Sequence, residues 1–206
     1  MRVLAAVVRV VLALAIIAAV VVTHLEAASR VVVNPFNLYG YFTIQSNLIA
    51  AIILLISGAI AFSGRVQGPW LSLFRALATT FLVIVGLVYA TLLAPLGAAG
   101  GVPIPWANAV LHIVSPIVIV LDWLLVGDRQ RIPLSRFWAV LVYPAVWTTV
   151  VLIRGATDGW VPYPFLDPAQ GYGVVALYAA AILVVFVVVG LLVLWASRFR
   201  GVVLRR

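Results

Sequence analysis

Long apolar runs alternate with short polar stretches along the whole chain. Compared with the roughly 20 residues that a helix needs to cross a bilayer, these runs predict six spans, at 3–23, 35–62, 72–94, 105–126, 134–153 and 173–196. The connecting stretches are too short for a further domain, and the runs lack the alternation typical of barrel strands. We therefore expect one all-α domain over residues 1–206, an integral membrane bundle of six transmembrane helices.

Local signals define the beginnings of some spans. Pro35 after Asn34 and Pro105 suit a first helical turn, where the missing N–H would be unpaired anyway. The first 30 residues also resemble a secretory signal, with small residues near Ala27 as a candidate cleavage site. We prefer an uncleaved membrane anchor, because this apolar stretch is long enough to cross a bilayer.

Charge predicts the orientation of the bundle. Of the 13 basic residues, all Arg, only Arg30 and Arg154 fall on one side of the predicted spans. Since short cytoplasmic loops carry the excess of positive charge, we expect both termini to be cytoplasmic and the loops 24–34, 95–104 and 154–172 to face outward. The basic tail, with Arg198, is expected to contact the lipid bilayer through anionic headgroups rather than nucleic acid.

Composition narrows the class and the chemistry. Hydrophobic residues make up 66% of the chain and charged residues 9%, with a mean hydropathy of +1.26, which excludes a soluble globular domain. The absence of Lys excludes Schiff bases and Gly-Lys phosphate loops, and the absence of Cys excludes disulfides and thiol nucleophiles. Two His and five scattered carboxylates make no close-spaced ligand set, so no metal or cofactor is expected. Arg without Lys is typical of bacterial genomes rich in G and C, which favours a bacterial cytoplasmic membrane.

Polar residues at membrane depth are costly and therefore mark candidate sites. The stretch 37–47 is too polar to face lipid, and its Gly40, Thr43 and Asn47 share one helical stripe. In the fourth span, Asn108, His112 and Ser115 also share a face. Counted from Pro35 and Pro105, Thr43 and His112 each lie roughly 10–12 Å below the outer end of the helix, so the two side chains can meet.

A meeting of these two side chains predicts ester cleavage. Neutral His112 would accept the proton of Thr43 as its hydroxyl attacks a carbonyl carbon. Candidates for stabilising the oxyanion or binding substrate are Asn47, Gln45, Ser46, Asn108 and Ser115. In the alternative interpretation, Thr43 bonds a backbone carbonyl one turn earlier and His112 only bridges helices. His24, at the outer end of the first span, is the sole competing base.

Two further features are expected to be structural. Asp122, the one carboxylate inside a span, and Arg75 lie at similar depths above the cytoplasmic side, which predicts an interhelical ion pair. The stiff loop 154–168 is rich in Pro and aromatic residues. We expect Trp160 and Tyr163 to anchor it at the membrane interface, with a roof over an outer cavity as the alternative.

Three motifs carry a resemblance to a known family. They are Asn-Leu-Tyr-Gly-Tyr-Phe-Thr-Ile-Gln-Ser-Asn at 37–47, Leu-His-Ile-Val-Ser-Pro at 111–116 followed by Asp-Trp at 122–123, and Arg-Gly-x-x-x-Gly-Trp-x-Pro-Tyr-Pro-Phe-Leu-Asp-Pro at 154–168. In their order and span positions the chain resembles the bacterial branch of the androgen-induced six-transmembrane protein family.

The resemblance implies an intramembrane threonine hydrolase. Animal members cleave fatty acid esters of hydroxy fatty acids with a Thr and a His, which correspond here to Thr43 and His112. We therefore expect a membrane-bound hydrolase acting on a membrane lipid or fatty acyl ester. The alternative is a non-catalytic lipid-binding or transport protein that uses the same polar outer cavity, and a structural partner of another membrane protein is a third possibility.

Overall fold

The computed structural model describes residues 1–199, 201 and 202. Within this part of the chain all regular elements are helices, and six of them are long and apolar enough to span a membrane: Arg2–Arg30, Phe42–Phe62, Pro69–Gly97, Pro105–Leu125, Leu134–Thr157 and Tyr172–Ala196. The predicted all-α, multi-pass architecture is confirmed at this level. The predicted basic tail residues Arg200, Arg205 and Arg206 lie outside the described residues.

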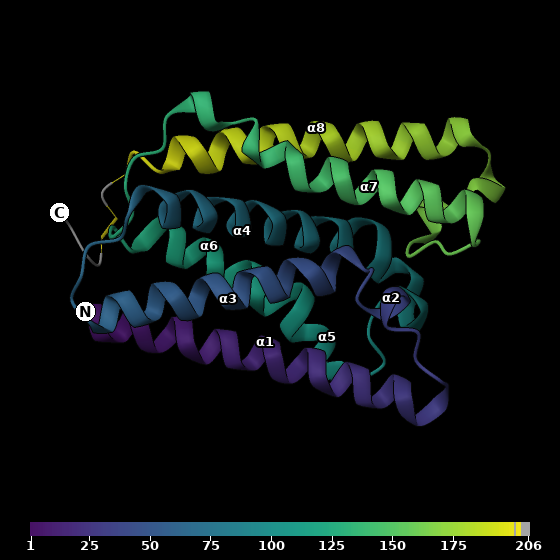
Figure 1. The fold of residues 1–206 in the computed structure, drawn as a ribbon, viewed down its shortest axis with the longest axis horizontal. Coiled ribbons are helices and arrows are strands. Elements are labelled where there is room, and N and C mark those ends of the chain that lie inside the picture. Colours follow the sequence, from purple (N-terminus) through teal and green to yellow (C-terminus); the bar gives the residue numbers. More distant parts are fainter. Residues whose placement is uncertain (200, 203–206) are drawn as a thin grey trace.

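The long helices run side by side along one axis (Figure 1). Helix α1 (Arg2–Arg30) packs on α3 (Phe42–Phe62), and α3 packs on α4 (Pro69–Val88). Helix α4 also contacts α6 (Ser115–Leu125) and α8 (Tyr172–Ala196), which lies beside α7 (Ala139–Thr157). The N-terminus marks one end of the bundle, and we call the opposite end, with residues 31–41, 94–104 and 158–171, the distal end (Figure 1).

The second predicted span is not one continuous helix. The side chain of Asn34 caps the four-residue helix α2 (Pro35–Leu38), and α3 begins only at Phe42. At Gly40 in the break, a Cβ atom would lie 2.5 Å from the carbonyl oxygen of Phe36 and 2.6 Å from the Trp160 ring. The prediction of an unbroken helix over 35–62 is therefore wrong at residues 39–41. At Gly40 itself, only a glycine fits the close approach.

Two wide helical turns interrupt the third and fourth spans. The π-helical turns η1 (Tyr89–Leu93) and η3 (Val110–Val114) each precede a proline, at Pro95 and Pro116. Proline lacks an N–H and its ring collides with the carbonyl four residues earlier, so the helix widens locally. His112 lies in η3. Its direction therefore does not follow the 3.6-residue period on which its predicted position rests.

A buried network of four charges holds the end of the bundle that carries the N-terminus. Arg75 lies 2.5 Å from Asp122, as expected of the interhelical ion pair, and 2.6 Å from Asp128. Arg9, fully buried, bonds the same two carboxylates at 2.8 and 2.6 Å. The side chain of Gln67 also contacts Arg75 and Asp128. Two cations thus pair with two carboxylates in a largely buried cluster, and Arg9 acts here as a structural residue in addition to any effect on topology.

Candidate functional site

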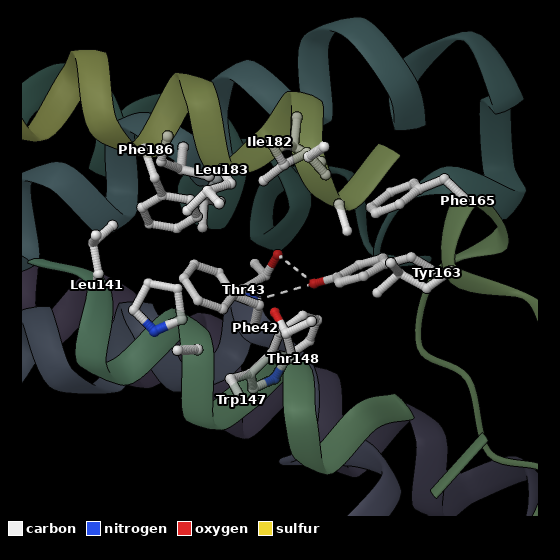
Figure 2. Close-up of a pocket in the computed structure, with 18 of the residues that line it drawn as sticks. Phe42, Thr43, Leu141, Trp147, Thr148, Tyr163, Phe165, Ile182, Leu183 and Phe186 are labelled. Carbon is white, nitrogen blue, oxygen red and sulfur yellow. Dashed lines mark hydrogen bonds between the residues drawn. The ribbon is translucent and has the colours of Figure 1, made fainter. Parts of the chain in front are cut away.

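Thr43 lines a cavity of about 500 Å³ between α3, α4, α7 and α8. The cavity extends along α7 and α8, from Phe165 at the distal end to Leu141 and Phe186 deeper in the bundle, and the Thr43 hydroxyl lies between these ends (Figure 2). Most of its lining is carbon. The hydroxyl groups come from Thr43, Thr148, Thr149 and Tyr163.

The Tyr163 hydroxyl contacts both the backbone N–H and the side-chain hydroxyl of Thr43. Because Thr43 is in the first turn of α3, its N–H has no intrahelical partner, and it donates to the Tyr163 hydroxyl oxygen at 3.2 Å. The Thr43 hydroxyl lies 3.3 Å from the same oxygen (Figure 2). Burial raises the pKa of Tyr163 to about 12. Tyr163 therefore stays protonated at neutral pH and can donate its proton to Thr43 or to a ligand oxygen.

The loop between α7 and α8 covers the distal end of this cavity. Tyr163, Phe165 and Leu166 are buried and line the cavity, so the expectation that Tyr163 anchors the loop at the membrane interface is wrong. The alternative of a roof agrees with this packing. Trp160 is half-buried, and the Arg154 guanidinium lies 4.2 Å from the centre of its ring.

His112 is buried but points to other partners than Thr43. Its ring stacks on Tyr89 with 4.3 Å between ring centres, and Nδ1 lies 3.2 Å from the carbonyl oxygen of Asn108. A carbonyl only accepts, so Nδ1 carries the hydrogen and Nε2 keeps its lone pair in the neutral ring. Among the described residues, His112 makes no hydrogen bond to Thr43 and does not line its cavity. The expected direct contact between the two side chains is therefore not formed.

Asn47 connects the two helices that carry these residues. Its Nδ2 donates to the backbone oxygens of Thr43 and Leu111, at 2.9 and 3.1 Å, and its Oδ1 accepts from Ser115 at 2.7 Å. Both Asn47 donor hydrogens and the Ser115 hydroxyl are thereby occupied. The predicted oxyanion or substrate role of this pair is not supported by the geometry, which instead gives them a structural role between α3 and the segment containing His112.

Three other predicted polar residues make no hydrogen bond to the Thr43 hydroxyl in the described part of the chain. Gln45 accepts a hydrogen bond from Tyr143 at 2.8 Å and donates to a backbone carbonyl, while Asn108 donates to the Tyr89 hydroxyl at 2.7 Å and accepts from a backbone N–H. Ser46 is fully buried, and its hydroxyl has no hydrogen-bond partner in the described part of the chain. Gln45 and Asn108 are thus engaged in holding neighbouring segments.

The competing base, His24, lies at the distal end of α1. Its Nδ1 is 3.3 Å from the Tyr39 hydroxyl, and it is not among the residues that line the Thr43 cavity. No group of three metal-ligating side chains occurs among the described residues. Tyr163 is the contact to Thr43 that sequence reasoning missed. Its place in the Pro-rich motif at 154–168 was the available signal, but an aromatic residue in such a loop also fits an interfacial anchor.

Comparison of the chain with protein-family models, with curated proteins and with solved structures finds no match. The family resemblance therefore rests on the three sequence motifs alone.

Proposed function

We propose that this chain is an integral-membrane hydrolase of lipid esters, with Thr43 as the nucleophile and His112 as the base. The observation that carries the proposal is the Thr43 hydroxyl in the wall of an otherwise largely apolar cavity within the spanning helices. A fatty acid ester of a hydroxy fatty acid is the substrate class that the resemblance implies.

The cavity suits a fatty acyl chain. Its volume of about 500 Å³ lies within the usual range for small-molecule sites. Aliphatic and aromatic side chains such as Ile84, Leu141 and Phe186 line its length, so burying a chain there removes apolar surface from contact with water. A carbonyl near the middle of the acyl chain would reach Thr43, where the described lining offers the hydroxyl groups of Thr43, Thr148 and Tyr163 as polar partners.

The proposed reaction proceeds through an acyl-threonine. The Oγ1 of Thr43 attacks the ester carbonyl carbon, its proton passes to Nε2 of His112, and the Tyr163 hydroxyl donates to the oxyanion. The C–O bond then breaks, and the alcohol leaves with the proton from His112. Water attacks the acyl carbon with His112 again accepting a proton, which releases the acid and restores Thr43. No hydrogen bond joins His112 and Thr43 in the structure, so this scheme requires His112 to move toward Thr43 in the substrate complex.

Active-site labelling tests the assignment. We expect a lipid-like fluorophosphonate to label the wild type and Thr43→Ser, because both carry a hydroxyl, and to leave Thr43→Ala unlabelled. His112→Ala should remove ester hydrolysis while the protein keeps its thermal unfolding transition in detergent. Retained labelling of a folded Thr43→Ala variant would contradict the proposal.

A non-catalytic lipid-binding protein is the second candidate. The absence of a hydrogen bond between His112 and Thr43 favours it, because a threonine without a base is a weak nucleophile. In that case a fatty acyl ester incubated with the wild-type protein would be bound and recovered intact by mass spectrometry. Hydrolysis that Thr43→Ala abolishes would exclude this candidate.

A further inference from the structure

Helices α7 and α8 pack closely toward the end of the bundle that carries the N-terminus. At Gly190 in α8, an added Cβ would lie 2.8 Å from Val140 and 3.2 Å from Phe137. Toward the distal end the two ribbons diverge (Figure 1), and the Thr43 cavity occupies the space between them.

The cavity reaches the side of the bundle in this space. Four of its lining residues are themselves exposed: Ala145 and Thr149 on α7, and Ala180 and Leu183 on α8, with Leu183 51% exposed. We call these four residues the side opening. Three of them carry small side chains. The lining residues of the roof, by contrast, are buried, as with Leu166 at 3% exposed.

The side opening lies at the depth of the hydrocarbon core. Ala180 is eight residues into α8, which places it about 12 Å along the helix from the distal end. The flanking surface positions are apolar, such as Leu177 and Val184, at 70% and 62% exposed. A spanning helix presents such a surface to acyl chains. The medium at the side opening is therefore lipid rather than water.

We propose that an acyl chain of a bilayer lipid enters the Thr43 cavity sideways, through the side opening between α7 and α8. The roof contributes buried aromatic rings at the distal end, whereas the side opening connects an apolar cavity to an apolar medium through small side chains. The proposal goes beyond the proposed function, because it concerns entry and binding only and holds for a hydrolase and a lipid-binding protein alike.

Photo-crosslinking in vesicles tests this route without turnover. The full chain is reconstituted in phosphatidylcholine that contains a small fraction of phosphatidylcholine with a diazirine near the end of one acyl chain. Labelled residues are mapped by mass spectrometry. We expect labelling at cavity residues that the protein itself buries, Phe42, Thr43 and Phe186, in addition to the exposed reference Leu177.

Tryptophan substitutions at the side opening, which we call plug variants, are compared with the same substitution at neighbouring control positions. Ala180→Trp fills the side opening from α8, and Ala181→Trp adds the same bulk at an exposed neighbour that does not line the cavity. In Ala180→Trp, the tryptophan should exclude two or more methylene groups of the acyl chain from the cavity. Labelling of the buried residues, relative to Leu177, should therefore fall about tenfold. Ala181→Trp should match the wild type. Ala145→Trp and Val146→Trp form an equivalent pair on α7, should the first plug not fold.

Two outcomes would overturn the proposal. Buried residues that stay unlabelled in the wild type would mean that no acyl chain enters, as when a second copy of the chain covers the side opening. Labelling that persists in both folded plug variants would mean entry by another route. Either result is independent of whether Thr43→Ala retains fluorophosphonate labelling, so failure here is distinguishable from failure of the hydrolase assignment.

Discussion

The hydroxyl oxygen of Tyr163 lies 3.2 Å from the backbone nitrogen of Thr43 and 3.3 Å from its hydroxyl oxygen. One side chain of the distal loop thus satisfies the first turn of α3 and contacts the candidate nucleophile. The roof of the cavity and the Thr43 hydroxyl are therefore coupled, and changes in one should alter the other.

Replacing Tyr163 by Phe removes this contact while retaining the buried ring. The Thr43 N–H is left unpaired in a buried position, so we expect the free energy of unfolding to fall by about 1–3 kcal/mol. If Tyr163 also donates to the oxyanion, kcat for ester hydrolysis should fall about 100-fold with little change in KM. Thermal unfolding in detergent and initial-rate kinetics measure the two effects.

Tyr172→Phe is the matched control for this prediction. Tyr172 is 64% exposed at the start of α8, and its hydroxyl makes no hydrogen bond to the described residues. It should leave both stability and turnover unchanged. A Tyr163→Phe variant with wild-type stability and turnover would show that the hydroxyl neither holds Thr43 nor assists it.

Arg9→Met should destabilise the bundle strongly. The substitution leaves the carboxylates of Asp122 and Asp128 with one ion-pair partner, Arg75, in a largely buried site. Removing one partner of a buried ion pair typically costs about 3–5 kcal/mol. Chemical unfolding in mixed micelles would measure the loss. The exposed Arg65→Met variant serves as the control, with an expected change near zero.

A second substitution should recover part of that loss. Adding Asp122→Asn to Arg9→Met restores the charge balance, leaving the pair of Arg75 and Asp128 at 2.6 Å. The double variant should therefore be more stable than Arg9→Met alone. Strictly additive losses would show that the charges do not act as one network.

The same network predicts a loss of stability in acid. Burial alone would raise the pKa of Asp128, but hydrogen bonds from Arg9 and the charges of Arg75 and Arg9 outweigh it and hold this pKa below its ordinary value of 3.8. The unfolded chain therefore binds a proton at higher pH than the folded chain does. The contribution of Asp128 to stability is present above that ordinary value and is lost as the pH falls through the lower folded value.

Unfolding in detergent between pH 7 and pH 3 would measure this dependence. Asp128→Asn, which cannot titrate, should be less stable at neutral pH and should show a weaker decline in acid than the wild type. An equal decline in both proteins would assign the acid sensitivity to other carboxylates.

Gly40→Ala should disturb the distal loop. The added Cβ meets the carbonyl oxygen of Phe36 and the ring of Trp160 at 2.5 and 2.6 Å, so both the backbone and the ring must move, at a cost of about 1–3 kcal/mol. Gly173→Ala in α8, where a Cβ meets nothing within 4 Å, should instead stabilise the helix by about 0.5–1 kcal/mol. Thermal unfolding and Trp fluorescence would distinguish them, and equal effects would argue against the tight packing at Gly40.

Several features of this protein follow from the sequence alone. Six apolar runs of spanning length determine a helical membrane bundle. In lipid, unsatisfied backbone N–H and C=O groups are too costly for irregular segments or open sheets to cross the bilayer. The polarity of 37–47 indicates that Thr43 faces the interior of the bundle. Asp122 and Arg75 lie at similar distances from the predicted cytoplasmic ends of their spans, which predicts their ion pair. Each of these features follows from the positions of apolar, polar and charged residues along the chain.

Tertiary packing decided the rest. The wide turn before Pro116 altered the direction of His112, so equal depth did not place it against Thr43. Tyr163, in a loop 120 residues further along the chain, contacts Thr43 instead. Arg9 and Asp128, from two other segments, complete the charge network. Such contacts depend on how helices rotate and where loops fold back, and helical periodicity carries no information on either. The sequence therefore determined which segments are long and apolar enough to span a membrane, while only the packed bundle determined that Tyr163 and Arg9 are buried and which residues they touch.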